Sequence, residues 1–160
     1  MSSPLERLAA LGLELPQVTA PVAAYVPALR SGDLVFTSGQ LPLRDGELVA
    51  TGKVGAEVEP EVAAACAQQC ALNVLAAVAA LVPLEEVRRV VKLVVFVASA
   101  PDFTGQPGVG NGASHLLGEV FGDAGRHARS AVGVAVLPLD APVEVEAVFE
   151  VGPGAGPGVG

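Results

Sequence analysis

The stretch VEVEAVFE at residues 143–150 places an apolar side chain at every second position. Successive side chains of a strand point to opposite faces, so alternate residues share a face. The first face carries Val143, Val145, Ala147 and Phe149. The second face carries Glu144, Glu146, Val148 and Glu150. This alternation predicts a strand with only one face in the core, and therefore a sheet that is covered on one side.

Other segments are expected to supply the remaining strands of this sheet. Residues 22–43 hold two short β-prone runs with RSGD between them, and RDGELV repeats the signal with an Asp-Gly pair at its tip, so two hairpins are predicted. Residues 90–97 are the most β-branched run and predict a central strand. A last hairpin is predicted from residues 129–137 and 142–151.

Helices are expected at three places. The N-terminal sequence MSSPLERLAALGLELP predicts a short amphipathic helix, and residues 62–82 predict a long apolar one that stops before Pro83. Residues 104–112, TGQPGVGNG, predict a glycine-rich loop that leads into a helix over ASHLLGEVFG. A phosphate-binding loop would end in Gly-Lys-Ser or Gly-Lys-Thr, which is missing here.

This order of elements predicts one α+β domain over residues 1–151, with about six strands in a mixed sheet and two helices on one face. Residues 152–160, GPGAGPGVG, are expected to be a disordered tail. Hydrophobic residues make up 51% of the chain and charged residues 16%. The uncovered sheet face is therefore expected to meet the same face of another subunit.

The charge balance argues against nucleic-acid partners. The chain has 9 Lys and Arg against 17 Asp and Glu, a net charge of −8, which is the wrong sign for a groove that follows phosphates. The N-terminus has no basic leader before an apolar core, so a cytoplasmic location is expected. The apolar residues 62–82 approach a membrane-spanning length, but three amides interrupt them, which favours a buried helix over a membrane span.

Cys66 and Cys70 are four residues apart within that predicted helix and therefore share one helical face. Buried thiols commonly behave as small apolar residues, and this is the interpretation favoured here. A metal site would need further Cys or His at ligand spacing, and the two histidines, His115 and His127, form no such pattern. No metal is expected.

Arg129 stands at the head of the strand SAVGVAVL, which otherwise contains no charge. A guanidinium donates two parallel hydrogen bonds to a carboxylate and holds it in one orientation. An ordinary surface arginine and a solvated row of glutamates remain the alternatives to a functional pair of Arg129 and Glu144. If the two strands pair through a turn at Pro138, these residues meet only loosely. They would need neighbouring elements or a second subunit to close a pocket.

Three segments, in this order, are similar to the motifs of one protein family. They are FTSGQLPL at residues 36–43, VVFVASAPDF at 94–103 and ARSAVGVAVLPLDAPVEVEAVF at 128–149. The last contains an arginine before serine, an apolar strand, Leu-Pro and a Val-Glu-Val-Glu-Ala strand. From about residue 17 to 151 the chain therefore resembles the Rid family of reactive intermediate deaminases, also called YjgF-like proteins, and its longer YjgF-like branch above all.

The resemblance implies a chorismate-mutase-like fold, a six-stranded sheet with two helices on one face, and a homotrimer whose sheets join around a central barrel. Family members have their active sites between subunits. The best-studied of them hydrolyse reactive enamines and imines, such as 2-aminoacrylate, to 2-keto acids and ammonia. The implied ligand is a small carboxylate-bearing imine or keto acid, and no metal or organic cofactor is implied.

Carried over residue by residue, the resemblance assigns Arg129 to clamp the substrate carboxylate and Glu144 to position or activate the attacking water. Tyr25 would shape the pocket wall, and the backbone of Ser38 and Gly39 would line the pocket. The remaining two positions are Asn111, in the loop before the second helix, and Ala131. Many members have cysteine where this chain has Ala131, but backbone contacts from that position would survive the change.

Two other functions compete with deamination. The first is a non-catalytic module that binds a small carboxylate or regulates another protein, since the longer branch can keep the pocket and use it differently. The second is ribonuclease activity, which an old label on some relatives suggests. The net charge of −8 and an aromatic content of 4% argue against RNA binding, because few rings are available to stack on bases.

Overall fold

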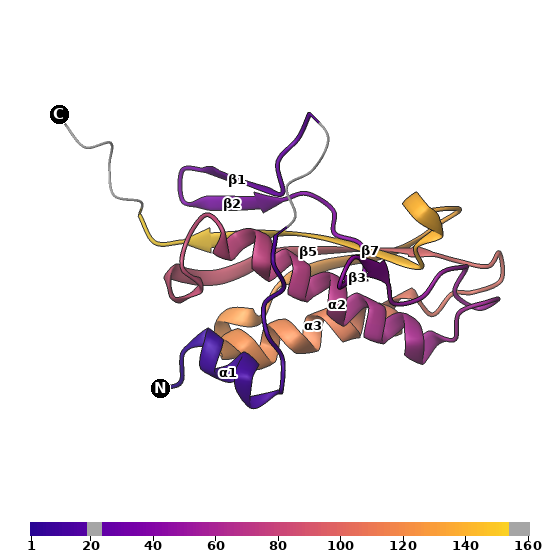
Figure 1. The fold of residues 1–160 in the computed structure, drawn as a ribbon, viewed down its shortest axis with the longest axis horizontal. Helices are drawn as coiled ribbons and strands as arrows, with labels where there is room; N and C mark the ends of the chain where they lie inside the picture. Colours follow the sequence, from indigo (N-terminus) through magenta and orange to yellow (C-terminus); the bar gives the residue numbers. More distant parts are fainter. Residues whose placement is uncertain (19–23, 154–160) are drawn as a thin grey trace.

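The computed structural model describes residues 1–18 and 24–153. It shows an α+β fold, in which helices α2 and α3 cover one face of a mixed sheet and α1 packs against α3 (Figure 1). The helices are α1 (Pro4–Ala10), α2 (Pro60–Ala79) and α3 (Gln106–Phe121), with short 3₁₀ turns η1 (Leu84–Glu86), η2 (Gly122–Gly125) and η3 (Pro138–Asp140). The strands are β1 (Ala28–Ser31), β2 (Leu34–Thr37), β3 (Leu43–Arg44), β4 (Glu47–Leu48), β5 (Val87–Ala98), β6 (Ala128–Val134) and β7 (Val143–Val151).

The main sheet has five strands in the order β1-β2-β7-β5-β6, within the part of the chain that the structure describes. The prediction of six strands was wrong because β3 and β4 pair only with each other, as a separate two-stranded ribbon. The predicted central strand is confirmed, since β5 pairs with a neighbour along both of its edges. Both N-terminal hairpins are also confirmed, as β1–β2 and β3–β4.

The predicted C-terminal hairpin was wrong. Strand β5 lies between β6 and β7, parallel to the first and antiparallel to the second. The turn at Pro138–Asp140 reverses the chain, but the returning strand passes beyond β5 before it pairs. This arrangement gives the apolar β5 a hydrogen-bonded neighbour along each of its edges.

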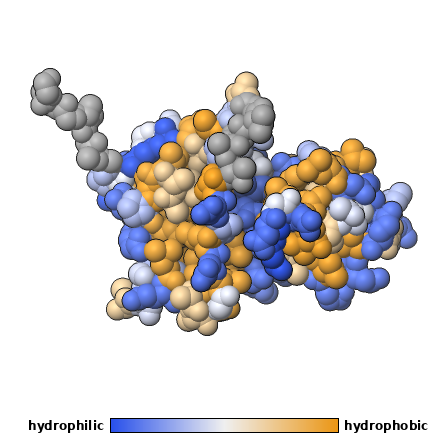
Figure 2. Space-filling view, in the orientation of Figure 1, coloured by the Kyte–Doolittle hydropathy of each residue, from blue (hydrophilic) through white to orange (hydrophobic). Residues whose placement is uncertain are grey.

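Strand β7 confirms the predicted two-faced pattern. Its burial alternates along the strand, and the apolar positions beneath the helices are at most 3% exposed: Val143, Val145, Ala147 and Phe149. The opposite face of the sheet, called the open face below, carries the glutamates. Apolar side chains also remain exposed there, at Leu29, Leu34, Phe36 and Val132. Apolar residues likewise form broad patches on the surface seen in Figure 2.

Helix α2 is long and apolar enough to cross a membrane, yet 67% of its most apolar window is buried inside the protein. It begins with Pro60, whose missing N–H costs nothing in a first helical turn. Cys66 and Cys70 are fully buried on its inner side. This burial supports the prediction that the helix lies inside the protein.

The predicted loop over residues 104–112 was wrong from Gln106 onward, because α3 begins there. A Cβ added at Gly112 would overlap the backbone carbonyl of Ala64 in α2. The glycine therefore allows the two helices to approach closely, and this packing outweighs the low helix propensity of glycine. The predicted tail lies outside the described residues from residue 154 onward.

Candidate active site

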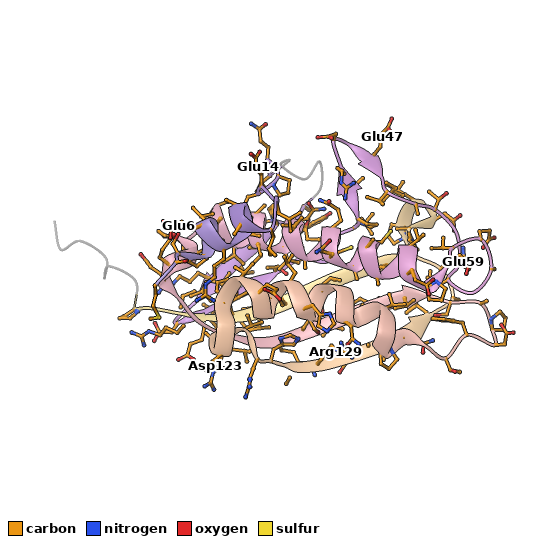
Figure 3. The ribbon with its side chains drawn as sticks, turned by 90° about the horizontal axis from the view of Figure 1, so that it is seen from below. Glu6, Glu14, Glu47, Glu59, Asp123 and Arg129 are labelled. Carbon is orange, nitrogen blue, oxygen red and sulfur yellow. The ribbon has the colours of Figure 1, made fainter. Side chains whose placement is uncertain are left out.

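Arg129 is the most highly connected polar residue predicted for the site. It pairs with Leu93 of β5, and its side chain runs toward α3 (Figure 3). Its Nη1 donates hydrogen bonds to Asn111 Oδ1 at 2.9 Å and to Ser114 Oγ at 3.1 Å. Its Nη2 donates to the carbonyl of Pro107 at 3.2 Å. Three acceptors on one helix therefore hold the guanidinium.

The charge of Arg129 is not neutralised by any carboxylate in residues 1–18 and 24–153. The ion pairs in these ranges involve Arg30, Lys53 and Arg126 instead. A guanidinium has five N–H donors, and three of them are used here. The Nε–H and one Nη2–H remain, which is the number of donors that a bidentate carboxylate accepts. The arrangement is suited to binding a small anion.

Asn111 accepts a hydrogen bond from this guanidinium, and Ala131 lies two residues after Arg129 on β6; Asn111 belongs to α3, whereas the sequence predicted it in a loop before the helix. Between them, a Cβ on Gly110 would lie 3.2 Å from Arg129 Nη1 and 3.4 Å from the Cβ of Ala131. Glycine at this position therefore leaves room for the guanidinium. Gly110 was not among the predicted site residues.

Ser114 and His127 were also missed. Ser114 Oγ contacts Arg129 Nη1, and it lies 2.9 Å from His127 Nε2. Pro107, Asn111 and Ser114 are spaced four and three residues apart, which places them on one face of a helix. That spacing could have identified Ser114, but only after the segment had been recognised as helical.

Glu144 lies on β7 opposite Phe96 of β5, and its side chain is on the open face. Burial raises the pKa of the Glu144 carboxyl above its ordinary value, and the charge of Glu146 raises the pKa further. A Cβ added at Gly39 would overlap the Glu144 carboxylate. The backbone of Gly39 and the Glu144 carboxylate are therefore in close contact.

Ser38 and Gly39 form a short irregular segment between the end of β2 and Gln40, the next residue that pairs with β7. Ser38 donates from its backbone N–H to Pro27 at 2.8 Å and from its hydroxyl to Val26 at 2.6 Å. Gln40 then exchanges two backbone hydrogen bonds with Val145, at 2.8 and 3.0 Å. These bonds fix the position of Ser38 and Gly39 beside Glu144.

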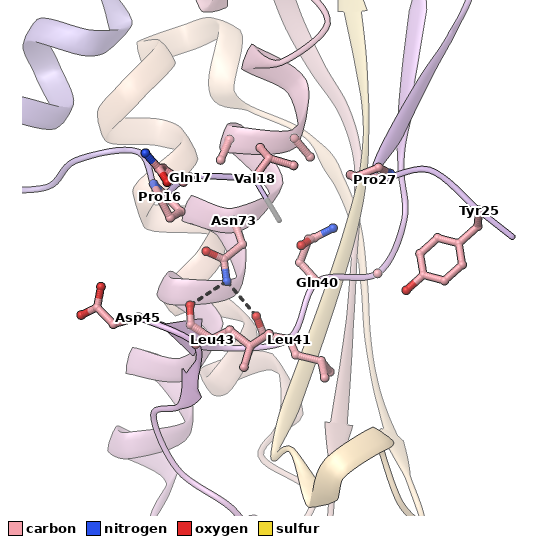
Figure 4. A pocket seen from close by; sticks show the side chains of 14 residues that line it. Pro16, Gln17, Val18, Tyr25, Pro27, Gln40, Leu41, Leu43, Asp45 and Asn73 are labelled. Carbon is pink, nitrogen blue, oxygen red and sulfur yellow. Dashed lines mark hydrogen bonds between the residues drawn. The ribbon is translucent and has the colours of Figure 1, made fainter. Parts of the chain in front are cut away.

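Tyr25 is 58% exposed and lines a cavity of about 650 Å³. Gly39, Gln40 and Asn73 are among the other residues that line it. Figure 4 shows Tyr25 on the side of the strands away from α2, whereas Asn73 projects from α2 and donates to the carbonyls of Leu41 and Leu43. Tyr25 and Gly39 thus line the same cavity, as Asn73 does from the side of α2.

The predicted site residues thus form two groups within one chain. The arginine group consists of Arg129, Asn111 and Ala131 beside α3. The glutamate group consists of Glu144, Gly39, Ser38 and Tyr25. Strand β5 separates β6 from β7, and the two charged side chains are on opposite faces, so one chain does not bring the groups together.

Other reactive groups lie away from both groups or are inert. Burial raises the pKa of Cys66 to about 11 and that of Cys70 well above its ordinary value, so both thiols stay protonated at neutral pH. Among the residues whose placement is described, no three His, Cys, Asp or Glu side chains gather in a way that could hold a metal ion.

Comparison with known proteins agrees with the resemblance seen in the sequence. The sequence model of the family described as endoribonuclease L-PSP matches residues 16–151. A Trypanosoma cruzi protein, Protein TCP17, is 50% identical over 142 residues, which cover 88% of this chain and 89% of that protein.

Two further relatives bear on activity and fold. A Dermatophagoides farinae protein named 2-iminobutanoate/2-iminopropanoate deaminase is 31% identical over 138 residues, covering 85% of this chain and 92% of its own length. The crystal structure of the YjgF gene product of Escherichia coli superposes with a TM-score of 0.62 at 32% identity, covering 82% of this chain and 91% of that one.

Proposed function

Because this chain belongs to the endoribonuclease L-PSP family, the YjgF-like or Rid family, we propose that it is a hydrolytic deaminase of reactive enamines and imines. Its substrates would carry a carboxylate, as 2-aminoacrylate does, and its products would be 2-keto acids and ammonia. The named deaminase from Dermatophagoides farinae, at 31% identity, supports this reaction class.

The observation that carries the proposal is the guanidinium of Arg129, which no carboxylate of the described residues neutralises. Its two remaining donors fit a substrate carboxylate, while Asn111, Ser114 and Pro107 hold the other three. Each charge-assisted hydrogen bond contributes about 1.5 to 3 kcal/mol, so two of them can dominate the affinity for a molecule of this size. The clamp would also orient the imine carbon next to the carboxylate.

The chemistry that remains is addition of water to an electrophilic carbon. 2-Aminoacrylate tautomerises to 2-iminopropanoate, and water adds to its C=N carbon to give a carbinolamine. The carbinolamine then loses ammonia as its C–N bond breaks, leaving pyruvate. Glu144 would accept a proton from the attacking water and return it to the leaving nitrogen. The raised pKa of Glu144 makes it a better base at neutral pH than an ordinary glutamate.

Assembly as a homotrimer would complete this site. The arginine group lies at β6, the edge strand of the sheet, and the glutamate group lies at the open face. The exposed apolar side chains of the open face, Leu29, Leu34, Phe36 and Val132, favour its burial against other copies. Three sheets joined around a central barrel would bring Arg129 of one subunit to Glu144 of the next.

The test uses 2-aminoacrylate generated in situ by a dehydratase acting on an amino acid. The purified protein is expected to release keto acid faster than buffer does, and Arg129→Ala is expected to abolish the acceleration. Release no faster than in buffer, across several amino-acid precursors, would contradict the proposal.

A second candidate function is binding of a small carboxylate without turnover. It is favoured by one observation, namely that the arginine group is complete within a single chain whereas the glutamate group lies elsewhere. Retention of pyruvate by a protein that does not accelerate deamination would identify this function. Cleavage of RNA, which the family description names, has the net charge of −8 against it.

A further inference from the structure

We propose that Ser114 and His127 are positioning residues, which orient the Arg129 guanidinium through a directed chain of hydrogen bonds that starts at the Gly125 carbonyl. The proposal rests on the proposed function of Arg129 as the carboxylate clamp. It adds two residues, neither of which contacts the substrate, to those that determine carboxylate affinity.

The chain has three links. His127 Nδ1 lies 2.6 Å from the carbonyl oxygen of Gly125, and His127 Nε2 lies 2.9 Å from Ser114 Oγ. Ser114 Oγ lies 3.1 Å from Arg129 Nη1. All three side chains in it are partly buried, which limits competition from water.

The direction of these bonds follows from the two ends. A carbonyl can only accept, so His127 Nδ1 carries a proton and donates to Gly125. In a neutral imidazole Nε2 is then an acceptor, and Ser114 must donate its hydroxyl proton to it. A guanidinium can only donate, so Arg129 donates to the lone pair left on Ser114 Oγ. With this neutral imidazole, each hydrogen of the chain has one acceptor, and the chain has a single orientation.

The hydrogen bond from the Ser114 hydroxyl to His127 is important because Ser114 lies inside a helix. A helical serine without another partner can donate to the carbonyl four residues earlier, here that of Gly110. His127 takes the proton instead, so the oxygen lone pairs stay directed at Arg129. The two acceptors on Nη1, Ser114 and Asn111, then fix the plane of the guanidinium and leave the Nε–H and one Nη2–H for the ligand.

The backbone of the η2 turn holds the Gly125 carbonyl in a fixed position. A Cβ added at Gly125 would overlap the carbonyl of Leu117 in α3, so only glycine lets the η2 turn pack this closely against the helix. That packing brings the Gly125 carbonyl within reach of the imidazole. The start of the chain is therefore fixed to the same helix that carries Ser114.

The test measures the dissociation constant of pyruvate by calorimetry for the full-length protein and four variants. Ser114→Ala and His127→Asn are expected to bind about tenfold more weakly, the effect of one hydrogen bond to a charged group. His127→Gln is expected to bind like the unmodified protein, because its amide oxygen can accept from Ser114 where Nε2 does. His115→Ala, which removes an exposed histidine one residue from Ser114, is the matched control.

Action through Arg129 is tested by a double-mutant cycle. In an Arg129→Lys background, Ser114→Ala is expected to have no further effect on pyruvate binding, because the guanidinium that it orients is gone. An equal loss in both backgrounds would show that Ser114 acts on its own and would overturn the proposal.

An independent measurement is the protonation of the His127 ring in the ligand-free protein, read from its ¹⁵N NMR shifts near neutral pH. The proposal requires the Nδ1–H tautomer, and the Nε2–H tautomer would overturn it. If the unmodified protein does not bind pyruvate at all, the proposed function fails. If it binds and Ser114→Ala binds equally well, only the positioning role fails.

Discussion

Arg129 and Glu144 lie on opposite faces of one sheet, on strands that β5 keeps apart. Arg129 pairs with Leu93 and reaches α3 on the covered face, whereas Glu144 pairs with Phe96 and lies on the open face. A clamp and a base that act on one small imine must both come within reach of it. Under the proposed function, one chain would therefore supply two separate half-sites, which other copies would complete.

Replacement of Arg129 tests the clamp. Arg129→Ala removes both donors offered to the carboxylate and is expected to weaken pyruvate binding by about a hundredfold or more, and Arg129→Lys by about tenfold because it keeps the charge without the fork. Calorimetry measures both. Arg126→Ala is the control, because Arg126 is exposed and its ion pair among the described residues is with Asp123. Unchanged binding by Arg129→Ala in an intact assembly would contradict the clamp.

Gly39→Ala is expected to displace the Glu144 carboxylate, because the added Cβ would occupy the position of that carboxylate. The carboxylate is at the end of a flexible side chain, so the fold should survive and the melting temperature should change little. We expect turnover of 2-aminoacrylate to fall at least tenfold, about 1.4 kcal/mol in activation free energy. Full activity together with a normal melting temperature would show that the position of Glu144 is not important.

The pH dependence of kcat/KM tests Glu144 as the base. The carboxylate form is active, so activity should rise with pH as Glu144 loses its proton. Glu146→Gln removes a negative charge that raises the pKa of Glu144. The rise should therefore move to lower pH. Glu150→Gln, on the same face of β7, is the control and should leave the profile in place. A profile that Glu146→Gln leaves unchanged would argue against Glu144 as the titrating group.

Gly112→Ala tests the close packing of α2 and α3. Its Cβ would overlap a backbone carbonyl, which cannot rotate away, so we expect the free energy of unfolding to fall by about 1 to 3 kcal/mol. Gly118→Ala, in the same helix with open space around its Cβ, should instead raise it by about 1 kcal/mol. Denaturant titration measures both changes. Equal effects of the two variants would refute the packing role of Gly112.

Local patterns in the sequence predicted those parts of the fold that depend on short-range periodicity. The alternation in β7 and the apolar run of β5 identified both strands, because burial on one face or on two leaves a direct mark on composition. The neighbour of each strand left no such mark. The turn at Pro138–Asp140 predicts that the chain reverses whether or not β5 lies between the two strands. For this reason the C-terminal hairpin was predicted wrongly.

The residues of the candidate site could likewise be predicted only in part. Arg129 and Glu144 were identified by motif, but Gly110, Ser114 and His127 were not. Their contacts depend on residues 106–112 being helical, and four of these seven residues are glycine or proline, which disfavour helix in isolation. Tertiary contact with Ala64 reverses that preference. Under the proposed function, Arg129 and Glu144 would meet only through a second chain, and no local pattern describes a contact between chains.

Mixing two inactive variants tests this central claim most directly. Arg129→Ala and Glu144→Gln are purified separately, unfolded together in equal amounts and refolded, and their mixed assembly is checked by native mass spectrometry. If each site takes Arg129 from one subunit and Glu144 from the next, about a quarter of the sites will be intact after random mixing, and about a quarter of the deaminase activity should return. Activity no higher than that of the separate variants, in assemblies shown to be mixed, would contradict the account.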